Sequence, residues 1–158
     1  MGQSAETSDF IVDCLISWWQ EHQHHYPSLE ELVIDLDSGS ATRSNRTQFI
    51  KRMVQFSMLI GLRIRLIYYP PYHSKYNQIE RCWAALEHYW NGSILDSVTA
   101  AINWSANMTW KGLKPLVYLV EAIYAKGIKV SPNELELYRP YWQCSKTLPK
   151  WDITISPN

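Results

Sequence analysis

The sequence predicts an α/β fold built around a parallel pair of strands, in one domain of 158 residues. Two segments have the pattern of strands: residues 31–36 are almost continuously apolar, and residues 62–68 alternate before they become apolar and reach two prolines. Between them, residues 46–60 carry apolar side chains at helical spacing, and Gly61 ends that helix. Because strand, helix and strand follow in this order, we expect a right-handed parallel crossover.

Composition and patterning exclude several classes of protein. Hydrophobic residues make up 46% and charged residues 19% of the chain, which is a globular mixture and not that of a disordered protein. No apolar run approaches the roughly 18–20 residues of a membrane span, and the N-terminus lacks the basic and apolar regions of a secretory signal. The three cysteines (Cys14, Cys82 and Cys144) form no CxxC pair, which argues against a zinc knuckle or a disulfide framework. We therefore expect a cytoplasmic protein without a membrane partner.

A helix is expected over residues 8–23, where Thr7 or Ser8 can cap its first turn. Three histidines lie at the C-terminal end of this helix: His22, His24 and His25. They have no carboxylate or thiolate at a suitable spacing, so a surface helix end is the preferred interpretation over a metal site. The strand that follows, at 31–36, has the nearly continuous apolar run of a parallel strand covered on both faces.

Further elements are predicted in the second half of the chain. Helices are expected over residues 77–90, where the apolar side chains lie on one face, and over 96–107 and 115–126, the last of them ended by Gly127. Residues 131–134 read Ser-Pro-Asn-Glu, a capping box with proline at the first helical position. Residues 151–155 are expected to form a short strand or an extended arm.

The net charge of zero conceals a basic central segment. Between Arg43 and Arg81 there are eight basic residues and one acidic residue, Glu80. We call the eight the basic block: Arg43, Arg46, Lys51, Arg52, Arg63, Arg65, Lys75 and Arg81. Such a block can attract a polyanion although the whole chain is neutral. The alternative is that these charges lie on solvated helix and strand faces.

Asp37 is the first candidate for chemistry. It lies at the C-terminal end of an expected buried strand, where ligands collect in open parallel sheets, and a glycine turn follows it. Asp35 is the rival candidate, because it shares the same strand face; Asp37 is preferred because it is nearer the turn. The structural alternative is that Asp37 only caps the turn through its own backbone.

Glu80 is the second candidate, at the start of the helix expected over 77–90. Asn77 and Glu80 resemble a capping box, which would explain this carboxylate without any chemistry. However, Asp37 and Glu80 lie on either side of a strand-helix-strand unit and are expected at the same end of the sheet. Carboxylate oxygens bind hard divalent ions, and two such ions can promote phosphoryl transfer.

The segment from Tyr68 to Trp83, YYPPYHSKYNQIERCW, resembles the last catalytic segment of the DDE transposases of insertion sequences. The stretch from about residue 7 to residue 112 is similar to one family, the Rhodopirellula-type insertion-sequence transposases. The helix start at residues 9–14 and the segment at 46–49 agree with this resemblance.

The resemblance implies a ribonuclease H-like fold in which two Asp residues and one Glu bind two magnesium ions. It assigns Asp37 to the second Asp position and Glu80 to the Glu position. It also implies that residues 1–112 are a partial catalytic domain without its first three strands and first Asp, and that residues 113–158 are a C-terminal helical extension of the same domain. The expected fold is thus a truncated ribonuclease H-like fold whose strand at 31–36 has a bare edge.

The implied activity is the cleavage and joining of DNA strands. Candidate contacts to the DNA are Arg43, Arg46, His73, Lys75 and Arg81. After the second Asp, the family pattern reads roughly Asn-Gly-Pro and then Asn-His-Ser. This chain departs from it at Ser38, Ser40, Thr42 and Arg43, beside the expected metal position.

We therefore expect a fragment of a DDE transposase that is inactive alone, since it lacks the first catalytic Asp and Asp9 and Asp13 are poor substitutes for it. One alternative is a non-catalytic DNA-binding or regulatory fragment that pairs with full-length transposase or with itself. Another is a degenerate protein without a function.

Overall fold

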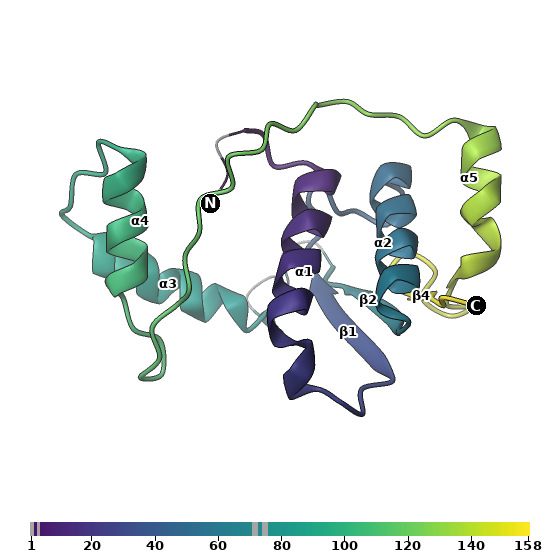
Figure 1. Ribbon diagram of the computed structural model, residues 1–158, viewed down its shortest axis with the longest axis horizontal. Helices are drawn as coiled ribbons and strands as arrows, with labels where there is room; N and C mark the ends of the chain where they lie inside the picture. Colours follow the sequence, from purple (N-terminus) through teal and green to yellow (C-terminus); the bar gives the residue numbers. More distant parts are fainter. Residues whose placement is uncertain (1, 3, 71–72, 74–75) are drawn as a thin grey trace. The chain divides into compact units, whose positions relative to one another are not determined.

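The computed structural model describes residue 2, residues 4–70, residue 73 and residues 76–158 (Figure 1). The chain forms two compact units, which are described separately. The sheet unit consists of Ala5–Pro71 and Tyr124–Asn158, and the helical unit consists of Met1–Ser4 and Tyr72–Ile123. The sheet unit is thus assembled from two segments of the chain that are far apart in the sequence.

The sheet unit contains a mixed four-stranded sheet with the strand order β1-β2-β4-β3. β1 (Glu31–Leu36) and β2 (Arg63–Tyr68) pair in parallel. β4 (Asp152–Ile155) lies between β2 and β3 (Trp142–Cys144) and is antiparallel to both. The parallel pair confirms the central prediction from the sequence, whereas the strand at 142–144 was not predicted.

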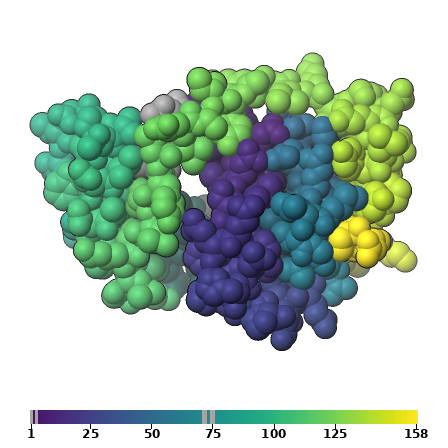
Figure 2. Space-filling model, viewed as in Figure 1, coloured from purple at the N-terminus to yellow at the C-terminus, as the bar shows by residue number. Residues whose placement is uncertain are grey.

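Two helices cover one face of this sheet. α1 (Ser8–His22) and α2 (Thr47–Ile60) lie side by side in front of it, and Figure 2 shows their side chains closely packed against each other. The caps are those that the sequence predicts: Thr7 Oγ1 accepts a hydrogen bond from the Phe10 amide at 3.2 Å, and Gly61 ends α2 with a φ of 69°. A short 3-10 helix, η1 (Gln23–His25), continues α1.

The hydrophobic core lies between α1, α2 and the covered face of the sheet. Its fully buried side chains include Val12 on α1, Phe49, Met53, Val54 and Phe56 on α2, Ile64 and Leu66 on β2, and Ile153 and Ile155 on β4. Alternate residues of β2 and β4 therefore point into the core, as in a sheet that is covered on one face.

The other face of the sheet is exposed in the part of the chain that the structure describes. It carries Val33 and Asp35 on β1 and Arg63 and Arg65 on β2, and the Val33 side chain is 49% exposed. The expectation that residues 31–36 are covered on both faces is therefore wrong, because α1 and α2 pack on the face that carries Leu32, Ile34 and Leu36. β1 is also an edge strand, as expected, since β2 is its one partner among the described strands.

The C-terminal part of the sheet unit has less helix than expected. α5 (Pro132–Tyr138) begins at Ser131, whose Oγ accepts from the Glu134 amide at 3.2 Å, as the capping box predicts. η3 (Arg139–Tyr141), β3 and β4 follow, so residues 151–155 contribute a strand and not an extended arm. Three residues are too few to show the alternation of a strand, which is why β3 was missed.

The helical unit contains α3 (Ile79–Trp90) and α4 (Val98–Asn107), both as predicted within two residues. The prediction of a helix over residues 115–126 is wrong, because this segment is not helical in the structure. Its apolar side chains have little to pack against: Leu116 is 71% and Ile123 is 90% exposed. A short helix takes most of its stability from such packing. Among the described residues, no helix is long and apolar enough to cross a membrane.

Candidate functional site

Asp37 follows β1 directly, at the edge of the sheet where the parallel strands β1 and β2 both end. Its side chain is exposed, and Oδ1 accepts a hydrogen bond from the Gly39 amide at 3.3 Å. A Cβ atom at Gly39 would lie only 3.2 Å from the same oxygen, so the turn closes tightly around the carboxylate. Asp37 therefore caps its turn, as the structural alternative proposed, and also presents an exposed carboxylate where ligands collect in such sheets.

Two hydrogen bonds hold the loop after Asp37 against β2 and α1, and a third closes the loop on itself. Tyr68 Oη donates to the carbonyl of Thr42 at 2.8 Å, and Ser8 Oγ donates to the carbonyl of Ala41 at 2.7 Å. Thr42 Oγ1 donates to the carbonyl of Asp37 at 3.3 Å. Burial raises the pKa of Tyr68, so its hydroxyl remains a donor. Thr42 is thus a structural part of this loop.

Asp35 lies on the same exposed face, two residues before Asp37. Its Oδ2 accepts from Tyr69 Oη at 3.4 Å, and the pKa of Tyr69 is raised by burial and by the negative charge of Asp35. Both carboxylates are exposed, so the choice of Asp37 over Asp35 stays a prediction.

Glu80 is exposed in the first turn of α3. The N-cap of this helix is Gln78, without a side-chain hydrogen bond, and Asn77 Oδ1 accepts instead from the Ile79 amide at 3.4 Å. The capping box of Asn77 and Glu80, which would have explained this carboxylate structurally, is therefore not formed. Since Glu80 belongs to the helical unit and Asp37 to the sheet unit, their shared crevice stays a prediction.

Asp37 and Glu80 are exposed oxygen donors, which is the ligand chemistry that magnesium prefers. Among the described residues, however, no group of three or more His, Cys, Asp or Glu side chains could hold a metal ion. The histidines at the end of α1 are no exception, although the rings of His24 and His25 lie 3.9 Å apart. Asp37 and Glu80 therefore fit the type of ligand, and a site that they share stays a prediction.

Ion pairs neutralise half of the basic block. Lys51 pairs with Glu134 at 2.6 Å, Arg63 with Glu31 at 2.7 Å, Arg65 with Asp152 at 2.8 Å, and Arg52 with both Asp9 and Asp13. The hydrogen bond from Arg65 lowers the pKa of Asp152. For these four residues, the ion pairs favour the interpretation as charges on solvated helix and strand faces over a role in attracting a polyanion.

The remaining basic residues are the ones proposed to contact DNA. Arg43 and Arg81 are exposed, Arg46 is half-buried, and none of the three forms an ion pair with a described residue. Arg46 Nη2 donates to the carbonyl of Ile128 at 3.4 Å. His73 is exposed, with its ring stacked on a neighbouring tyrosine, and Lys75 lies outside the described residues. Arg43 and Arg46 place positive charge on the loop that follows Asp37.

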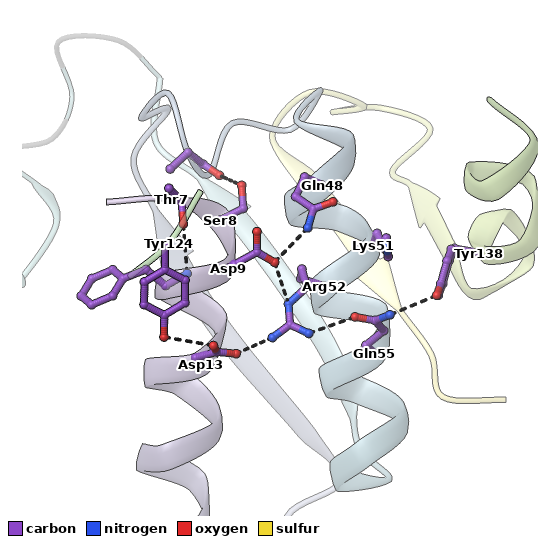
Figure 3. A network of polar contacts seen from close by, with 12 residues as sticks. Thr7, Ser8, Asp9, Asp13, Gln48, Lys51, Arg52, Gln55, Tyr124 and Tyr138 are labelled. Carbon is purple, nitrogen blue, oxygen red and sulfur yellow. Dashed lines mark hydrogen bonds and ion pairs between the residues drawn. The ribbon is translucent and has the colours of Figure 1, made fainter. Parts of the chain in front are cut away.

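Arg52 is the centre of a polar network between α1 and α2 (Figure 3). Its Nε lies 3.2 Å from Asp9 Oδ1, and its Nη2 contacts Asp13 Oδ1. Tyr124 Oη donates to Asp13 Oδ2 at 3.0 Å, and burial and this hydrogen bond raise the pKa of Tyr124 to about 12. Asp9 and Asp13 thus have structural partners, and the expectation that they do not replace a catalytic Asp stays a prediction.

The comparisons with known proteins give one result. A family model described as the Rhodopirellula transposase DDE domain matches residues 1–157. Neither a curated protein nor a solved structure matches the chain. The matched region extends well past residue 112 and includes β3 and β4, so it takes in the strands that complete the sheet. The chain belongs to the Rhodopirellula transposase DDE domain family.

Proposed function

We propose that this chain takes part in DNA strand cleavage and transfer by an insertion-sequence transposase, with Asp37 and Glu80 as ligands of divalent metal ions. The observation that carries the proposal is the exposed Asp37 carboxylate at the C-terminal end of β1, in a chain of the DDE family. A cytoplasmic location and DNA as the partner belong to the same proposal.

The proposed roles follow from the chemistry of the side chains. Magnesium ions, when bound, supply an activated nucleophile and stabilise the leaving oxygen of a phosphodiester. Asp37 and Glu80 would hold these ions. Arg43 and Arg46 on the Asp37 loop, together with Arg81 beside Glu80, would bind DNA phosphates close to both carboxylates. Lys75 and His73, between β2 and α3 in the sequence, complete this proposed set.

Metal binding at Asp37 is tested with Mn²⁺, which broadens the NMR signals of nearby nuclei. Titration of the chain with Mn²⁺ is expected to broaden the amide signals of residues 35–39, and Asp37→Asn is expected to abolish this effect. Asp35→Asn is the matched control, because it removes a carboxylate from the same exposed face. If Asp35→Asn abolishes the broadening and Asp37→Asn does not, Asp35 is the ligand. If neither variant changes the broadening, the metal proposal fails.

We also propose that the chain alone does not cleave DNA. The supporting observation is that the described residues hold no group of three metal-binding side chains. A two-ion site with too few carboxylates stabilises the transition state poorly. We expect no nicking of supercoiled plasmid by the purified chain with Mg²⁺ or Mn²⁺. Nicking that Glu80→Gln abolishes would contradict this prediction and would mean that another residue supplies the missing ligand.

A second candidate is a non-catalytic fragment that binds DNA or regulates full-length transposase by pairing with it. The exposed edge of β1 favours this function, because an unpaired strand edge can accept a strand of another chain. Salt-dependent DNA binding without metal-dependent cleavage, together with co-purification of full-length transposase, would distinguish it from the catalytic proposal.

A further inference from the structure

A pocket in the helical unit, between α3 and α4, is not used by the site described above. It has a volume of about 390 Å³ and is lined by Tyr89, Asn103, Trp104 and Asn107. This volume is at the lower end of the range for small-molecule sites. All four side chains are exposed, so the pocket is open to solvent.

We propose that this pocket binds one unpaired nucleobase of the transposase's DNA, with a preference for adenine. The inference rests on the proposed function, because it takes DNA as the ligand. It adds a base-binding site made of other residues than the proposed metal ligands and phosphate contacts.

The aromatic pair provides the stacking surface. The rings of Tyr89 and Trp104 have their centroids 5.3 Å apart and meet at 67°, so they form a corner and not a parallel stack. A flat base can stack on one ring while its edge contacts the other. The Tyr89 and Trp104 side chains remain 40% and 37% exposed, so packing between the two helices leaves much of their surface uncovered. Aromatic rings exposed in this way are what proteins use to bind unpaired bases.

The two asparagines provide a polar edge. Asn103 and Asn107 are one helical turn apart on α4, and Asn107 Nδ2 donates to the carbonyl of Asn103 at 2.9 Å. This hydrogen bond fixes the Asn107 amide and leaves its oxygen and second N–H for a ligand. A side-chain amide presents one donor beside one acceptor, which matches the N6 and N7 edge of adenine.

The pocket lining itself carries no negative charge, and basic residues follow its second helix in the sequence. None of the four lining residues is acidic, and two exposed lysines, Lys111 and Lys114, follow the end of α4. Lys111 Nζ lies 5.8 Å from the centre of the Trp110 ring. These lysines can bind the phosphates that flank an extruded base.

The test compares two fluorescent duplexes, one fully paired and one with a single unpaired adenine, by fluorescence anisotropy at fixed low salt. The full chain is expected to bind the duplex with the unpaired adenine about 10-fold more tightly, as for one base stacked on an aromatic ring. Trp104→Leu is expected to remove this difference while the affinity for the paired duplex is unchanged. Trp18→Leu is the matched control, because Trp18 is 36% exposed on α1 and lies far from this pocket in the sequence.

Two further variants separate stacking from base recognition. Trp104→Phe keeps an aromatic ring and is expected to retain most of the preference. Asn107→Ala is expected to bind unpaired adenine and unpaired thymine equally, whereas the parent chain prefers adenine. Circular dichroism establishes that each variant is folded; if Trp104→Leu is not, Tyr89→Leu takes its place.

The outcomes distinguish this inference from the proposed function. Equal affinity for the two duplexes, or a preference that survives the loss of the aromatic ring, overturns the base pocket and leaves DNA binding intact. Absence of binding to either duplex overturns the base pocket and the proposed DNA contacts of Arg43, Arg46 and Arg81 together.

Discussion

A chain that ends at Cys144 is expected to lose its cooperative unfolding transition in urea. The truncation removes β4, whose Ile153 and Ile155 are fully buried and whose backbone pairs with β2 on one side and β3 on the other. Burial of two isoleucine side chains contributes about 3–6 kcal/mol, which is comparable with the ~5–15 kcal/mol that stabilises a whole domain. Circular dichroism during a urea titration measures the transition.

The matched control for this truncation is a chain that ends at Ser156. It lacks only Pro157 and Asn158, which follow β4, and its unfolding midpoint is expected to be unchanged. If the chain that ends at Cys144 unfolds at the midpoint of the full chain, β4 does not have the structural role described above. The expected result would place the C-terminal residues within the folded domain and not in an appendage to it.

Replacement of Arg52 by Met is expected to lower the free energy of unfolding by about 2 kcal/mol. Its guanidinium group is the cationic partner of both Asp9 and Asp13, and the Arg52 side chain is only 22% exposed. Removing it leaves two carboxylates between α1 and α2 without that partner. Breaking a buried pair costs about 3–5 kcal/mol, and the partial exposure of this network reduces the expected value. Urea denaturation measures the change.

Arg63→Met is the control for the Arg52 prediction. Its partner is Glu31 on the open face of the sheet, and the Arg63 side chain is 52% exposed. An exposed pair contributes less than about 1 kcal/mol. The double variant Arg52→Met, Asp13→Leu is expected to recover part of the loss, because it removes one unpaired carboxylate. Equal effects of Arg52→Met and Arg63→Met would contradict the role assigned to this network.

The sequence predicts those parts of the fold that are encoded locally. β1, α2 and β2 were predicted, because apolar periodicity and a terminal glycine specify each element. The position of β4 was not, since its partner β2 lies more than eighty residues earlier in the chain. The expected helix at 115–126 failed for the opposite reason: the local pattern is present, but the described structure gives its apolar side chains little to pack against.

In the candidate site, too, the sequence predicts the features that depend on local pattern and misses those that depend on tertiary contacts. The position of Asp37 at a strand end follows from local pattern, and the structure places it there. The hydrogen bonds of Ser8 and Tyr68 to its loop are tertiary contacts that no spacing in the sequence indicates. The ion pairs of Lys51 and Arg65 are not evident from the sequence either, because their acidic partners, Glu134 and Asp152, come from distant segments.

The strand order of the sheet has a consequence for synthesis on the ribosome. β2 lies in the interior of the sheet, but one of its neighbours, β4, is translated more than eighty residues after it. Until then, the edge of β2 that β4 covers is unpaired and the core that includes Ile64 and Leu66 lacks two isoleucines. Nascent chains with such an edge are prone to aggregate and depend on chaperones. Completion of the sheet therefore has to wait for β4, and a ribosome that stalls between β2 and β4 would release an aggregation-prone product.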